Sequence, residues 1–337
     1  MKAGRPKTSL PLRAVGRFAA SLVSRAVRIR ELGTFSVLLV ICVGLAIRCP
    51  GFSDLDNVLT VSRAFSLVAI MAVGQTLIIV TGGIDLSVGS IFGLSGITTA
   101  ILVATGQPLW LACTAGVAAG IAFGAVNGLL VTKGRIPPFI ATLGTLSVGR
   151  TIIFWLTGEG QPVSLSSSNA QHLVLTGNLR NVIPILFMLG ATVLGGIYLN
   201  YMRAGRETYA VGGGEQAARL SGVSVNTIKL LAYVITGGLC GIAGILGTSI
   251  LNVGDPTAGA GMELDVIAAS VIGGTSLAGG QGTVLGAFLG AAIMGVIKNG
   301  LVLLYIPAIF HVGIIGIVIV AAVLFDTWRR RVSSSGG

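Results

Sequence analysis

Long apolar runs alternate with short polar segments along this 337-residue chain. A helix needs roughly 20 apolar residues to cross the hydrocarbon core of a membrane, and most of the runs are near that length. The pattern therefore predicts an all-α integral membrane protein of about ten transmembrane helices. The predicted spans are 32–47, 58–81, 86–104, 109–132, 139–157, 182–201, 227–248, 264–277, 283–304 and 307–327.

Composition supports this fold class. Hydrophobic residues make up 53% of the chain and charged residues 10%, with a mean hydropathy of +0.92, whereas soluble domains carry about 25% charged residues. We expect one transmembrane domain at 32–327, between a basic tail at 1–31 and a short tail at 328–337. The 51 glycines are about twice the usual share, which is typical of closely packed membrane helices.

The net charge of +11 has a distribution that indicates membrane topology rather than nucleic-acid binding. Seventeen of the 22 basic residues fall in 1–31, 133–135, 203–229 and 329–331. Basic loops stay on the cytoplasmic side, so both termini are expected there and segment 158–181 outside. The basic start could belong to a signal peptide, but no small-x-small cleavage site follows the first apolar run, so we expect an uncleaved span.

Glycine recurs at every fourth position of the fourth span, at Gly116, Gly120, Gly124 and Gly128. This spacing puts all four on one helix face, where another helix can approach to backbone distance. The neighbouring Asn127 is either a hydrogen-bonding residue of that contact or part of a substrate path.

A second set of glycines indicates an internal repeat. Gly82, Gly83, Gly89 and Gly93 recur 197 residues later, at positions 279, 280, 286 and 290. Repeated units of this kind surround the pathway in many transporters.

The longest polar segment with a basic balance is 203–229. Within it, Glu215 and Arg219 are four residues apart and Ser221-Gly222 follows, which predicts a short helix at 215–220. A helix of this length is not stable alone, so it must dock on the protein's own membrane face or on a partner.

Two charged residues within or beside the spans are candidates for the substrate path. Asp85 lies between two spans, and it is either a helix N-cap, with Ser87 as the competing cap, or a gating carboxylate. Arg150 lies about 10 Å inside the fifth span, where a charge must reach the interface, pair with an acid or face a wet cavity.

Three further polar residues are path candidates. Glu263 and Asp265 open the eighth span, where acids favour the helix dipole, and Asn299 lies near the end of the ninth. His172 is expected in an outer loop and His311 in helix packing. The four cysteines have no metal-site spacing, and no phosphate-binding loop, nucleophile elbow or HExxH motif occurs, so no metal or catalytic residue is expected.

Four motifs carry a family resemblance: TGGIDLSVGS (81–90), PPFIATLGTLSVGR (137–150), GRETYAVGG (205–213) and ELDVIAASVIGGTSLAGGQGTVLG (263–286). From about residue 57 to 303 the chain resembles permease subunits of ribose/xylose-type ABC importers. The chain departs from that pattern at Met262, where relatives often have Tyr.

The resemblance implies a bacterial inner-membrane permease for a monosaccharide or related small polar solute. It also implies a separate ATPase that binds ATP and Mg, a soluble extracytoplasmic binding protein and a second permease copy, with no cofactor on this chain. Segment 203–229 matches the family's coupling loop; its candidate contacts are Arg206, Glu207, Gly213, Glu215, Ala217, Ala218, Arg219 and Leu220. An amino-acid-type ABC permease and a self-sufficient secondary transporter are the alternatives.

Overall fold

The computed structural model describes residues 31–165, 173, 179–307, 309–311, 313–318, 320–321 and 324. The expected tail at 328–337, the expected tail at 1–31 except for Glu31, and His172 lie outside the described residues. All statements below concern the described part of the chain.

Seven helices in the described residues are long and apolar enough to cross a membrane. Shorter apolar helices are α3 (Val88–Ala104) and Ile309–Val318. The predicted all-α membrane fold is therefore confirmed. The seven long helices are Glu31–Arg48, α2 (Leu55–Val80), α4 (Leu109–Thr132), α5 (Pro138–Leu156), α6 (Leu179–Tyr201), α9 (Val225–Leu251) and α11 (Val284–Leu303).

The predicted span at 264–277 is wrong as a full crossing. Here the structure has α10 (Met262–Ile272), an 11-residue helix that ends at Gly273. At 1.5 Å per residue it is about 16 Å long, roughly half the thickness of a hydrocarbon core. Gly274 has a φ of +92°, which a left-handed turn requires, and the chain then continues without a helix to Thr283. We call residues 273–283 the second connection, and residues 81–87, between α2 and α3, the first connection.

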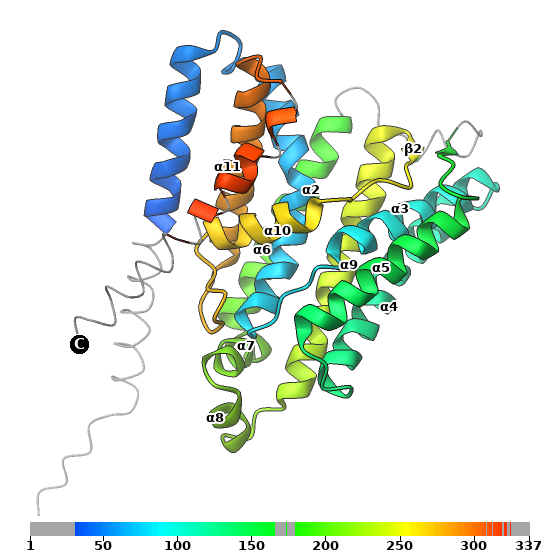
Figure 1. The fold of residues 1–337 in the computed structure, drawn as a ribbon, viewed down its shortest axis with the longest axis vertical. Helices are drawn as coiled ribbons and strands as arrows, with labels where there is room; N and C mark the ends of the chain where they lie inside the picture. Colours follow the sequence, from blue (N-terminus) through cyan, green and yellow to red (C-terminus); the bar gives the residue numbers. More distant parts are fainter. Residues whose placement is uncertain are drawn as a thin grey trace, which may run out of the picture.

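Helices α2 and α9 form the centre of the bundle. Helices α3 and α4 pack on α9, α5 packs on α3, and α6, α10 and α11 pack around α2. In Figure 1, α10 lies across the bundle, whereas α2, α9 and α11 run along it. The main core brings together small and branched side chains of α2, α3, α9, α10 and α11, so helices far apart in sequence share one interior.

The two ends of the bundle differ. At one end, α7 (Arg203–Gly213) and α8 (Glu215–Leu220) follow α6 and lead into α9 (Figure 1). Toward the other end, β1 (Val163–Ser164) and β2 (Val253–Gly254) pair antiparallel, with Val163 opposite Gly254. We call the first of these the α7/α8 end.

Candidate functional site

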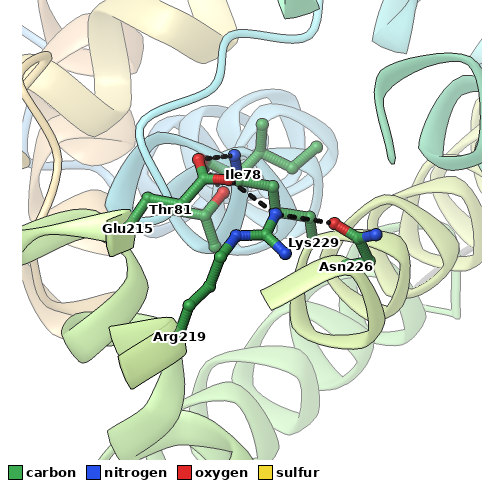
Figure 2. Close-up of polar contacts among 6 residues, drawn as sticks. All are labelled: Ile78, Thr81, Glu215, Arg219, Asn226 and Lys229. Carbon is green, nitrogen blue, oxygen red and sulfur yellow. Dashed lines mark hydrogen bonds and ion pairs between the residues drawn. The ribbon is translucent and has the colours of Figure 1, made fainter. Parts of the chain in front are cut away.

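The short helix predicted at 215–220 is present as α8, and an ionic network attaches it to α9. The Glu215 carboxylate accepts hydrogen bonds from Arg219 Nη2 at 2.8 Å and from Lys229 Nζ at 2.5 Å. Arg219 Nη2 also donates to Asn226 Oδ1 at 3.1 Å, and Figure 2 shows Glu215 between its two cationic partners. These partners lower the pKa of Glu215 from its ordinary value.

Helix α8 docks on its own chain through one face and exposes the other. Ala218 is buried with Val211 and the first turn of α9, whereas Ala217 is exposed and Leu220 is 86% exposed. Ala218 therefore holds α8 in place, and only Ala217 of the two alanines can touch a partner. Ala217 and Leu220 face away from the rest of the described chain, where a partner protein can reach them.

The other candidates of segment 203–229 lie on α7. Arg203 Nε pairs with Glu207 Oε1 at 2.6 Å, and Arg206 Nη1 donates to the Tyr201 carbonyl at 3.0 Å. Gly213 is exposed, and a Cβ at this position would meet no atom within 4 Å. Arg206, Glu207 and Gly213 therefore form a polar, accessible surface beside α8.

The glycine face of α4 lies against α9. A Cβ on Gly120 would overlap the Gly237 carbonyl oxygen, and one on Gly124 would overlap that of Tyr233. Gly116 lies in the same way against Thr99 of α3, and Gly128 against Leu230. At Gly120 and Gly124 no side chain larger than hydrogen fits without moving a backbone, whereas at Gly116 and Gly128 the closest atoms belong to side chains.

Asp85 and Asn127 belong to one buried polar cluster that joins the first connection to three helices. Asp85 Oδ1 accepts from the N–H and the hydroxyl of Ser87, at 2.7 and 2.6 Å. Asn127 Nδ2 donates to Ser87 Oγ at 2.7 Å, and Thr145 Oγ1 donates to Asn127 Oδ1 at 2.6 Å. With its amide oriented to match, Gln75 exchanges two 3.2 Å hydrogen bonds with the Asp85 backbone.

This geometry corrects the N-cap interpretation of Asp85. The N-cap residue of α3 is Ser87, whose hydroxyl donates to Asp85 rather than accepting from the helix. Asp85 instead closes a local turn two residues earlier. Its side chain is fully buried, which places it inside the bundle rather than at an open mouth.

Arg150 attaches α5 to the loop that precedes α10. Its Nη1 donates to the Ala258 carbonyl at 2.8 Å, and the charges of Glu263 and Asp255 interact favourably with it. Arg150 also lines an open cavity of about 530 Å³ with Phe154, Trp155 and Glu159. A charge here is stabilised by a carbonyl, two acids and an accessible cavity, which satisfies the requirement for an intramembrane arginine.

The two acids of α10 point to different neighbours. Glu263 lies against α3, where a Cβ on Gly89 would meet its Oε2, whereas Asp265 pairs with Lys298 of α11 at 2.5 Å. Asn299 exchanges two hydrogen bonds with Asn57 of α2, at 2.9 and 3.2 Å. Lys298, Asn299 and Asp265 also line a mainly apolar cavity of about 240 Å³ between α2 and α11. The path candidates thus occupy three separate places instead of one site.

Comparison with known proteins identifies the family of the chain. Residues 57–323 match the family model described as branched-chain amino acid transport system / permease component. The chain belongs to this permease family. It is 41% identical over 297 residues to a ribose import permease of Escherichia coli K12, covering 87% of this chain and 92% of the relative. A ribose import permease of Bacillus subtilis is 39% identical, over 88% and 92% of the two chains. An L-arabinose ABC transporter permease of Azospirillum brasilense is 34% identical, over 90% and 89%. No solved structure matches the chain.

The sequence candidates leave out several residues that the structure places in polar contacts. Gln75 pairs with the Asp85 backbone, Thr145 with Asn127, and Lys298 with Asp265. Tyr209 of α7 donates to the Gly282 carbonyl of the second connection at 2.7 Å. The sequence feature that could have indicated the contact of Tyr209 with the second connection is glycine on both sides of it, at 212–214 and at 279 and 280. No group of three or more potential metal ligands occurs in the part of the chain that the structure describes.

Proposed function

We propose that this permease is the membrane subunit of an ATP-driven importer that carries a monosaccharide into the cell. The observation that carries the substrate class is the 41% identity, over nearly the whole of both chains, to a relative named a ribose import permease. An arabinose permease among the relatives favours a pentose or a related small sugar. The chain acts as a transport subunit without chemistry of its own, and a partner binds ATP and Mg.

Helix α8 is the docking element for the ATPase in this proposal. It is accessible, carries an exposed Leu220, and is braced on α9 by the Glu215 network, so a force on it reaches a central helix. A soluble sugar-binding protein delivers substrate at the opposite end, where β1 and β2 pair. A second permease copy completes the pathway.

The proposed orientation puts the α7/α8 end in the cytoplasm with both chain termini. The basic residues Lys133, Arg135, Arg203 and Arg206 gather there, as cytoplasmic loops require. Impermeant thiol labelling of intact cells tests this with Ser167→Cys and Ser334→Cys, both outside the described residues. We expect labelling at position 167 only; labelling at 334 contradicts the orientation.

Uptake by proteoliposomes tests the transport function and its substrate. The permease, the ATPase encoded beside it and the neighbouring binding protein are reconstituted with ATP inside, and uptake of radiolabelled ribose, arabinose and leucine is compared. We expect ATP-dependent uptake of a sugar only. Leucine uptake supports the amino-acid alternative, whereas sugar uptake driven by an ion gradient without ATPase supports a secondary transporter.

A further inference from the structure

At the α7/α8 end, three backbones from distant parts of the chain meet on α7. Gly280 N of the second connection donates to the Val80 carbonyl at the end of α2, at 2.9 Å. Gly212 of α7 lies against both: a Cβ there would overlap Val80 O and lie 2.5 Å from Gly280 N. Tyr209 adds its hydrogen bond to the Gly282 carbonyl. We call Tyr209, Gly212, Gly280 and Gly282 the α7 junction.

The junction lies where the two connections touch. Gly82 and Gly279 correspond to each other in the glycine repeat, and both have a φ of +85°. A Cβ on Gly279 would be 3.1 Å from Gly82 Cα, so the two connections meet through these glycines. Position 282 corresponds to Asp85, whose carboxylate accepts from Ser87 within the first connection, and Ser87 in turn accepts from Asn127 of α4. In the second connection that position presents a backbone carbonyl to α7 instead.

Helix α7 is also firmly joined to α8. Val211 of α7 and Ala218 of α8 pack in one buried cluster with Val225 and Ile228 of α9. The second connection leads in the other direction to α10, the short helix that carries Glu263 and Asp265 inside the membrane. A displacement of α7 and α8 must therefore move the second connection or break the junction.

We propose that the α7 junction transmits movement from the docked ATPase to the second connection and α10, with Tyr209 as the positioning residue that keeps them engaged. The inference rests on the proposed function, because it assigns a route to the force that the ATPase exerts on α8. The 11-residue helix α10 is the segment that this force repositions. Discontinuous helices with non-helical connections form the substrate site in many transporters, and gating movements open and close that site.

Tyr209→Phe tests the junction with the smallest change, because it removes one hydroxyl and keeps the ring. Tyr201→Phe is the matched control, since Tyr201 is 78% exposed at the same end. In proteoliposomes we expect Tyr209→Phe to bind the ATPase normally and to hydrolyse ATP, while sugar transported per ATP falls about two- to tenfold. Unchanged transport per ATP, or loss of ATPase binding, overturns the inference.

Gly212→Ala makes the same test by steric separation, with Gly196→Ala as the control because a Cβ at 196 meets nothing within 4 Å. We expect Gly212→Ala to uncouple hydrolysis from transport more strongly than Tyr209→Phe; coupling as in the control overturns the inference.

Hydrogen exchange gives a readout independent of transport. Trapping the nucleotide-bound complex should change exchange in 204–213 and 273–283 together in the wild type, and in 204–213 alone in Tyr209→Phe.

A change in both segments of Tyr209→Phe overturns transmission through this contact. If the wild-type permease retains no ATPase, the proposed function itself fails, and the inference fails with it. Failure of the inference alone is distinguishable from failure of the proposed function, because ATPase binding and hydrolysis by the wild type then remain intact.

Discussion

Two contacts in this permease bring backbones close together through glycine, but their surroundings differ. The α4–α9 contact joins two long helices through Gly120 and Gly124, deep in the bundle. The α7 junction joins short segments at one end, through Gly212 and a single tyrosine hydroxyl. Close backbone approach along two long helices gives a permanent contact. The same approach beside short, separately connected segments gives one that can pass on movement.

The largest effect expected from this comparison is on the α4–α9 contact. Gly124→Leu should reduce assembled permease in the membrane by about tenfold, because overpacking a filled interface costs about 1–3 kcal/mol. Even Gly124→Ala should lower it, since the added Cβ meets a backbone carbonyl. Detergent-solubilised protein is quantified by size-exclusion chromatography, with Gly144→Leu as a control because position 144 is open. Normal assembly of Gly124→Leu contradicts a permanent contact.

We expect the polar cluster around Asp85 to be a permanent contact, like that between α4 and α9. Asp85→Ala removes the acceptor of two hydrogen bonds from Ser87 and should destabilise the permease by about 1–3 kcal/mol, measured as a lower Tm. Asp85→Asn keeps an acceptor oxygen and should retain transport within about twofold. Loss of transport in a well-assembled Asp85→Asn protein would assign the charge a role in gating.

Features of the fold that depend on residues close together in the sequence could be predicted, whereas contacts between residues far apart could not. Apolar runs predicted the long helices, and the local spacing of Glu215 and Arg219 predicted α8. The end of α10 was missed because residues 273–277 are small and weakly polar, so hydropathy does not distinguish them from a membrane span. The polar cluster around Asp85 was also missed, since Asn127 and Thr145 come from other helices and join it through Ser87. The burial of Ala218 follows from the packing of α7 on α9, which no local pattern encodes.

The smallest expected effect concerns the Glu215 network, which attaches α8 to α9 at the same end as the α7 junction. The partners of Glu215 lower its pKa in the folded protein, so its stabilisation is present above the ordinary glutamate value of 4.5 and is lost as pH falls through the lowered pKa. Glu215→Gln should lower the Tm by about 2 °C at pH 7, because exposed ion pairs contribute about 0–1 kcal/mol.

Measuring both proteins from about pH 7 to about pH 2.5 checks the sign, because the stabilisation is lost only below the ordinary glutamate value. The difference in Tm between wild type and Glu215→Gln should shrink as pH falls below 4.5. A difference that stays constant over this range would show that the carboxylate charge does not hold α8.

The most direct test of the central claim, that an ATPase docks on α8 and drives transport, is hydrolysis stimulated by the loaded binding protein in reconstituted complexes of Ala217→Glu. Ala217 is exposed, so the substitution adds a charged side chain to the docking face without disturbing the buried Ala218. The account predicts that stimulated hydrolysis and pull-down of the ATPase are both lost, in Ala217→Glu and in a companion Gly213→Trp, with normal membrane insertion. Asn200→Glu, exposed at the same end, should keep both. Wild-type stimulation and transport in the Ala217→Glu and Gly213→Trp proteins would contradict the account.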